Sequence, residues 1–406
     1  MDNIFSMIKK SPTQMHFIAC ARENLIKNGF VELKENENWE SIPNQFFVVR
    51  SEESIIACNI HDLDNGLIFA TNLDYPCFKV KPNSGIIKDN AELLNIQNYG
   101  YAMWFTWMDR DLTIAGKVIF NDKESGKQNV KYIHVQNPLC TIPSLASHLT
   151  PVPKDRYALS IDESMRPIIS FLDKEQSNNN ESTQSSSLLS CLAKECNCDI
   201  SDIIDFDLSV ISAEEPSKIG VNEEIYASQR ISSILQASFA FDAFINHKPQ
   251  KGMTIFYGYD HENDQNESRT GFDSNFLKNT LNRIHVSNSF YYNSLLLGAV
   301  RIPAAYALPS YGVCYRQGNI GKCQSRYIDF DKYLSELQKN EIPSQKCMTT
   351  YDIRCGIEEL SVHLNISSLY FGIPIYSLHS IRESAFLNDI TNYYYSVQTF
   401  FKLNQE

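Results

Sequence analysis

The apolar positions near the start of the chain follow a helical period. From Phe17 to Ile26 they recur every three or four residues, and Gly29 is a suitable stop, so we expect a helix within residues 12–30. Short apolar runs bounded by polar turns follow, and they predict strands at residues 46–50, 54–60 and 66–76. The last of these runs ends in a polar turn, and in open α/β sheets ligands gather at that end of a strand.

The pattern changes between about residues 84 and 220. Short alternating runs at 117–120 and 131–135 predict strands. A stretch rich in serine and asparagine over residues 174–187 predicts a disordered loop. Two short helical segments are expected after this loop, at residues 188–192 and 200–204.

Helical and strand patterns alternate again after residue 225. Helices are predicted at residues 227–245, 272–284 and 383–402, and strands at residues 253–259, 294–300 and 367–374. Alternation on both sides of a β-rich middle predicts an α/β domain that is interrupted by an insertion. Residues 1–83 and 221–406 would form the α/β domain, and residues 84–220 the insertion.

Composition narrows the range of partners. The 406 residues include 36 Lys and Arg against 48 Asp and Glu, which gives a net charge of −12 without a basic block. This charge argues against a nucleic acid or an anionic membrane as partner. No apolar run reaches the roughly 18–20 residues of a membrane span, and the first residues lack the pattern of a secretory signal. We therefore expect a cytoplasmic protein whose 11 cysteines are reduced.

The tightest cysteine group comprises Cys191, Cys196 and Cys198. Their C-x4-C-x-C spacing has no histidine nearby, so a zinc cluster would need a fourth ligand from elsewhere in the chain. We favour a cysteine-rich helix end over a zinc site here.

Several segments closely resemble signature stretches of the aspartyl aminopeptidase family of cytosolic zinc exopeptidases. They are residues 73–81, 98–120, 133–149, 259–263 and 377–384, and they occur in the family's order. In addition, Asp352, Cys355 and Gly356 align with an Asp-Thr-Pro-Cys-Gly element of the family. The resemblance implies a three-layer α/β/α zinc-exopeptidase-like domain split by a β-rich dimerisation domain. It also implies assembly into hollow dodecamers that remove N-terminal Asp or Glu from peptides.

In the family that the chain resembles, ligands from five segments hold two zinc ions, and four of these five ligands are replaced here. Asn72 stands where the family has a ligand His, although Asp74 two residues later is kept. Ser232 stands where the family has the bridging Asp. Asn263 replaces a ligand Glu, while the preceding Glu262 matches the family's general base.

The other two segments leave one ligand. The family's Ser-Ala-Asp-Met segment aligns with the end of strand 294–300 and the following VRIPAAY, with a register that stays open within residues 284–312. No Asp or Glu occurs between Asp273 and Asp329, so no carboxylate ligand exists in any register. His379 matches the fifth ligand and is kept. One ligand does not hold catalytic zinc, because such sites need about three protein ligands.

The substrate pocket implied by the resemblance is partly kept. His148 matches a family His that reaches into the neighbouring subunit's pocket, and Arg326 and Tyr327 match a family Arg-Tyr pair. Glu358 and Glu359 add carboxylates near a pocket meant for Asp or Glu, and they would repel that substrate.

These replacements predict a catalytically inactive pseudopeptidase in which Asp74 and Glu262 are vestigial. We expect no cofactor, and a role as scaffold, peptide binder or oligomer subunit, with itself or with an active paralogue as partner. Two alternatives stay open. One is an active aminopeptidase that holds zinc through His261, Glu262 and His379, and the other is a small-ligand binding module that uses the old pocket.

Overall fold

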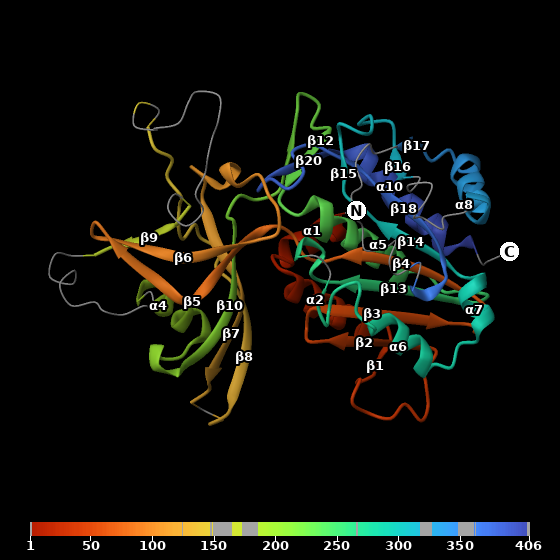
Figure 1. Cartoon of the computed structure of the whole chain (residues 1–406), viewed down its shortest axis with the longest axis horizontal. Helices are drawn as coiled ribbons and strands as arrows, with labels where there is room; N and C mark the ends of the chain where they lie inside the picture. Colours follow the sequence, from red (N-terminus) through yellow and green to blue (C-terminus); the bar gives the residue numbers. More distant parts are fainter. Residues whose placement is uncertain are drawn as a thin grey trace. The chain divides into compact units, whose positions relative to one another are not determined.

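The computed structural model describes residues 2–123, 125–146, 148, 165–172, 186–264, 267–316, 327–347, 361 and 363–403. The chain forms two compact units (Figure 1). The larger unit comprises Met1–Tyr75, Pro216–Leu378 and Glu383–Glu406, and the smaller unit comprises Pro76–Glu215 and His379–Arg382. The chain therefore enters the smaller unit earlier than residue 84, because the strand that begins at Cys77 already belongs to the smaller unit's sheet.

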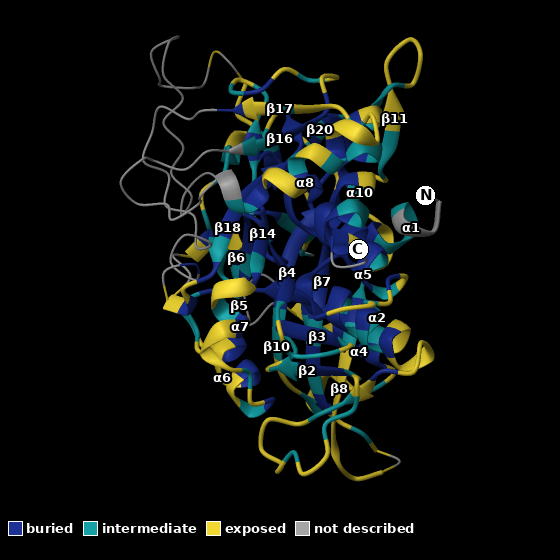
Figure 2. Ribbon diagram, turned by 90° about the vertical axis from the view of Figure 1, so that its right-hand side faces the viewer, coloured by how far each residue is buried: buried dark blue, intermediate teal, exposed yellow. Residues whose placement is uncertain are grey.

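A nine-stranded mixed sheet forms the centre of the larger unit, in the order β1-β2-β3-β13-β4-β14-β18-β16-β17. Its strands are β1 (Val31–Glu32), β2 (Gln45–Arg50), β3 (Ser54–Ile60), β4 (Gly66–Asn72), β13 (Met253–Tyr259), β14 (Leu295–Ala299), β16 (Val313–Arg316), β17 (Ser344–Cys347) and β18 (Ser367–Gly372). Strands β4, β13 and β14 are parallel neighbours in the middle of this sheet. They are almost wholly buried, as continuous apolar runs predict for central parallel strands (Figure 2).

Helices pack on both faces of this sheet and make the larger unit a three-layer α/β/α structure. One core contains residues of α1 (Asp2–Lys10), α2 (Gln14–Lys27), α5 (Gln236–Ile245), α8 (Tyr327–Lys339) and α10 (Leu387–Phe401). The other contains residues of α6 (Phe276–Arg283) and α7 (Asn288–Asn293). Because side chains alternate along a strand, Phe47 joins the first core while its neighbours Phe46 and Val48 join the second.

Two of the predicted helices begin with strands. Residues 225–228 form β12 (Ile225–Ser228) and residues 383–386 form β20 (Glu383–Phe386), and these two strands pair with each other. With β11 (Ser217–Ile219) they make a small sheet, while β15 (Ile302–Pro303) and β19 (Pro374–Ile375) make another. The helical predictions at 227 and 383 were wrong by several residues, because a pairing between segments so far apart leaves no local signal.

The smaller unit is built on a six-stranded antiparallel sheet in the order β8-β7-β10-β5-β6-β9. Its strands are β5 (Cys77–Lys88), β6 (Ala91–Tyr99), β7 (Leu112–Asn121), β8 (Gln128–His134), β9 (Ile168–Phe171) and β10 (Ile203–Ser212). Leu188 and Leu192 of helix α4 (Ser186–Cys196) pack into its core. The helix expected at 200–204 is instead a single 3-10 turn at Ile200–Asp202, after which β10 begins.

The disordered loop predicted at 174–187 lies outside the described residues, except for Ser186 and Ser187, which open α4. Among the helices that the structure describes, none is both long enough and apolar enough to cross a membrane.

Candidate functional site

Polar residues gather at the carboxyl edge of the three parallel strands in the middle of the larger sheet. Strand β4 ends at Asn72 and is followed by Asp74, strand β13 ends at Tyr259 and is followed by Asp260–Asn263, and β14 is followed by Arg301. Because parallel neighbours end at the same edge, the fold itself brings these segments together. This is the end of the strand where the sequence pattern predicts a ligand site.

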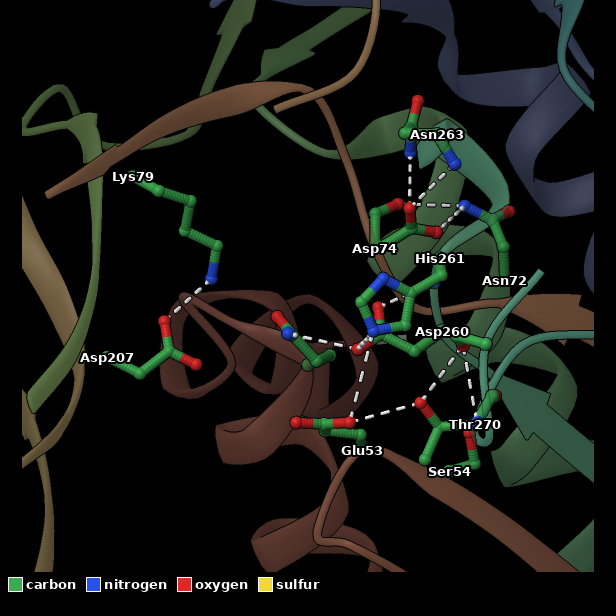
Figure 3. Close-up of polar contacts among 12 residues, drawn as sticks. Glu53, Ser54, Asn72, Asp74, Lys79, Asp207, Asp260, His261, Asn263 and Thr270 are labelled. Carbon is green, nitrogen blue, oxygen red and sulfur yellow. Dashed lines mark hydrogen bonds and ion pairs between the residues drawn. The ribbon is translucent and has the colours of Figure 1, made fainter. Parts of the chain in front are cut away.

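The buried Asp74 carboxylate is the hub of this cluster (Figure 3). Its Oδ2 accepts hydrogen bonds from the backbone N and the side-chain Nδ2 of Asn263, both at 2.8 Å. The Asn72 Nδ2 donates to the backbone oxygen of Asp74 at 2.8 Å and to its Oδ1 at 3.3 Å. The two asparagines, which the resemblance matches to family ligands, therefore hydrogen-bond Asp74 through their amide nitrogens, which cannot ligate a metal.

Arg301 extends a guanidinium into the same cluster. Its Nη1 donates to Asn263 Oδ1 at 2.7 Å, and its Nη2 lies 3.5 Å from Glu262 Oε2 and 4.0 Å from Asp74 Oδ1. The side chain is only 11% exposed. Burial by itself would lower the pKa of Arg301, but the carboxylates of Glu262 and Asp74 outweigh it and raise this pKa. The cluster therefore contains a permanent cation.

Arg301 is the second residue after β14, and its side chain contacts residues of two other segments that resemble the family's ligand segments. It lies within residues 284–312, where the resemblance to the family's Ser-Ala-Asp-Met has an open register. Sequence reasoning missed Arg301 because it searched this segment only for carboxylates; an arginine directly after an apolar strand was the available signal.

Glu262 begins a 3-10 turn, Glu262–Asp264, beside this guanidinium. Its Oε2 accepts a hydrogen bond from the Tyr259 hydroxyl at 3.1 Å. Burial raises the pKa of Glu262, although Arg301 acts in the opposite direction. The carboxyl that matches the family's general base is therefore engaged with a cation and a phenol.

Ser232, at the position of the bridging aspartate, lies in a π-helix, Ile231–Leu235. Its backbone N and its Oγ each donate to the Glu383 carboxylate at 2.8 Å. Glu383 reaches it because β20 pairs with β12, which precedes the π-helix by two residues. The buried Arg230 between them has a left-handed backbone, and its guanidinium lies 5.5 Å from the centre of the Tyr75 ring.

His379, which the resemblance matches to the fifth ligand, belongs to the smaller unit. The sequence prediction had placed it in the α/β domain. Its backbone oxygen accepts a hydrogen bond from the backbone N of Met103 at 3.1 Å. Of the predicted pocket residues, His148 lies in an exposed turn and Tyr327 is the first residue of α8. Arg326 lies outside the described residues, as do Glu358 and Glu359 and the aligned Asp352, Cys355 and Gly356.

One group of three side chains among the described residues has the spacing to hold a metal ion: Glu53, Asp260 and His261. His261 thus faces the carboxylates of Glu53 and Asp260. The alternative zinc site had paired it with Glu262, which instead lies beside Arg301. The three clustered cysteines form no such group in the part of the chain that the structure describes. Burial raises the pKa of each of their thiols, that of Cys196 to about 11, which disfavours thiolate ligands.

Solved structures with the same fold define the class of protein. The chain matches a chain of the cryo-EM structure of the Ape4 and Nbr1 complex with a TM-score of 0.91 at 24% identity, over 99% of this chain and 85% of that chain. It matches an M18 aminopeptidase from Thermotoga maritima with a TM-score of 0.82 at 18% identity, over 98% and 95% of the two chains. The fold is thus the α/β zinc-exopeptidase fold.

The sequence comparisons give the family. The model of the aminopeptidase I zinc metalloprotease family (M18) matches residues 7–316, and the chain belongs to this family. A probable M18 family aminopeptidase 2 of Clostridium novyi is 27% identical over 98% of this chain and 97% of its own length. Aspartyl aminopeptidase 1 of Schizosaccharomyces pombe is 28% identical, over 94% of this chain and 90% of its own length. The aspartyl aminopeptidase of Dictyostelium discoideum is 27% identical, over 98% and 95% of the two chains.

Proposed function

We propose that this M18 family member is a pseudopeptidase, which keeps the fold of an aspartyl aminopeptidase and does not hydrolyse peptides. The observation that carries the proposal is the Arg301 guanidinium among Asp74, Glu262 and Asn263. A cation in place of a carboxylate ligand removes a lone-pair donor and adds a positive charge. At 4 Å and an effective dielectric constant near 20, an arginine would oppose a divalent ion by about 8 kcal/mol.

Three further contacts support the loss of the zinc centre. The side chains at the former ligand positions Asn72, Ser232 and Asn263 are neutral and engaged in internal hydrogen bonds. Glu262 has no zinc-bound water to deprotonate in such a site, so the carboxylate of the general base lacks its reaction partner. Asp74 and Glu262 would instead balance the charge of Arg301.

The role that remains is assembly or peptide binding in the cytoplasm. One solved relative is a dodecamer of yeast mature aminopeptidase 1, with a TM-score of 0.83 at 19% identity. We propose that this chain likewise assembles with itself, or with an active paralogue, and that its pocket binds peptides without cleaving them.

The test is an aminopeptidase assay on peptides with N-terminal Asp or Glu, with zinc or manganese added, and with the Dictyostelium aspartyl aminopeptidase as positive control. We expect no turnover above that of the buffer. Turnover that EDTA abolishes, and that the Glu262→Gln variant lacks, would overturn the proposal. Activity that is equal in wild type and Glu262→Gln would identify a contaminating peptidase and leave the proposal standing.

A further inference from the structure

A second group of ligand-bearing side chains lies beside the degenerate centre, on the same short segment after β13. Asp260 and His261 face Glu53 (Figure 3). The next two residues, Glu262 and Asn263, face Arg301 instead. Glu53 lies in the turn between β2 and β3. The three side chains offer one imidazole nitrogen and two carboxylate oxygens that all lie within 4.8 Å of one another.

The distances suit a zinc ion. Ligand atoms 2.0–2.2 Å from zinc lie about 3.3–3.6 Å apart at the tetrahedral angle. His261 Nε2 lies 3.6 Å from Asp260 Oδ2 and 4.0 Å from Glu53 Oε2. The first distance fits as it stands, and the second fits after a shift of a few tenths of an ångström. Glu53 and His261 can make that shift, because their side chains are 22% and 30% exposed.

Neighbouring polar groups hold the two carboxylates in place. Gln14 Nε2 donates to Asp260 Oδ2 at 3.2 Å, and Thr270 Oγ1 donates to Glu53 Oε2 at 3.0 Å. Asp260 is buried, and its Oδ1 accepts a hydrogen bond from the backbone N of His261 at 2.9 Å. Hydrogen bonds of this kind orient metal ligands in established sites. The partial exposure of His261 provides a path from solvent.

We propose that Glu53, Asp260 and His261 form a site for a divalent transition metal, with zinc as the ion that the donor set suits best. Three protein ligands leave the fourth position of a tetrahedral ion to water. None of the three residues is a ligand in the family's pattern, so the site does not depend on the lost zinc centre. It also does not depend on the proposed lack of activity.

The test is a titration of the full-length protein, purified without a metal-affinity tag and freed of metal with EDTA, with zinc chloride alone in an isothermal calorimeter at pH 7.5. We expect one zinc ion per chain, and a loss of affinity of at least about 100-fold in Glu53→Gln and in His261→Asn. Glu52→Gln, in the same turn, and His285→Asn, a histidine with a similarly left-handed backbone, are the matched controls and should bind like wild type. Circular dichroism and the melting temperature of each variant establish that it is folded.

Two results would overturn the metal site. One is absence of zinc binding by wild type up to 1 mM. The other is unchanged affinity in both folded site variants, which would place the zinc elsewhere. Zinc bound at this site without peptide turnover supports both proposals. Turnover that Glu53→Gln abolishes would support the metal site and overturn the pseudopeptidase.

Discussion

At the scale of single residues, the site is organised by one buried cation and the carboxylates around it. Arg301 contacts Asn263 and lies within 4.0 Å of Asp74 and Glu262, and each of these side chains is largely buried. In an active family member metal ions would supply the positive charge at this place. Here the chain supplies it, so the charge balance of this cluster should depend on Arg301.

Replacement of Arg301 by methionine should destabilise the protein by about 3–5 kcal/mol, because it leaves buried carboxylates without their counter-charge. Urea denaturation monitored by circular dichroism measures the loss. Asp74→Asn should recover part of it in the Arg301→Met background, as a double-mutant cycle would detect. A cost below about 1 kcal/mol, or simple additivity of the two changes, would contradict the charge-balancing role of Arg301.

A second residue-scale prediction concerns acid stability. Burial, with a smaller contribution from Lys402, lowers the pKa of His247 to about 4. The unfolded chain has the higher pKa, so it binds the proton more readily, and stability is lost as the pH falls from about 6.5 toward 4. The size of this pKa shift limits the loss of stability from His247 to about 3 kcal/mol. His247 stacks on Phe401, so His247→Phe keeps an aromatic contact while removing the titration.

The measurement is the free energy of unfolding in urea between pH 7 and pH 4.5 for both proteins. Wild type should lose stability relative to His247→Phe as the pH falls. A difference that stays constant across this range would show that His247 does not titrate differently in the folded and unfolded chains.

At the scale of elements, the π-helix Ile231–Leu235 and the β12–β20 pair form one unit around Glu383. The pairing of Ser228 with Glu383 places the Glu383 carboxylate next to Ser232. This carboxylate accepts hydrogen bonds from the backbone N and the Oγ of Ser232. The aspartate of an active family member at position 232 would face this carboxylate across a hydrogen-bond distance. The local structure therefore suits serine in the absence of metal.

Ser232→Asp, which restores the family's residue, should destabilise the protein by more than about 2 kcal/mol and restore no activity, because two carboxylates would meet in a buried place. Ser232→Asn, similar in size and neutral, is the control and should cost clearly less. Thermal denaturation in the presence and absence of zinc measures both. Equal stability of Ser232→Asp and Ser232→Asn would contradict this account. Stabilisation of Ser232→Asp by zinc that exceeds the stabilisation of wild type would show that the old centre can still assemble, because zinc at the site proposed above would stabilise both proteins equally.

At the scale of the whole molecule, the question is assembly. We expect an oligomer in solution, with twelve 46.4 kDa chains as the form that the resemblance implies. Size-exclusion chromatography with multi-angle light scattering measures the mass directly. His148→Ala should leave the fold of the chain intact, since this side chain lies in an exposed turn. A monomer at micromolar concentration would contradict the proposed role as an oligomer subunit.

The sequence by itself determined the layered α/β architecture, and it predicts the loss of the family's ligands. Apolar runs such as residues 66–72 and 253–259 are local signals, since a central parallel strand must be apolar on both faces. The predicted replacements at Asn72, Ser232 and Asn263 rest on the resemblance of short segments. Conclusions that depend only on which residue types occur, and in what order along the chain, can be drawn from the sequence.

Only the tertiary structure decided which side chains meet at the carboxyl edge of the central strands. Arg301 meets Asp74 and Asn263 because β14, β4 and β13 are parallel neighbours, although their segments are tens to hundreds of residues apart. The same applies to Glu53 and His261, and to the β12–β20 pair, which occupies the first residues of two predicted helices. These contacts arise from the order of strands in a sheet. That order is set by the packing of the whole chain, and the hydrophobic period of a single segment does not predict it.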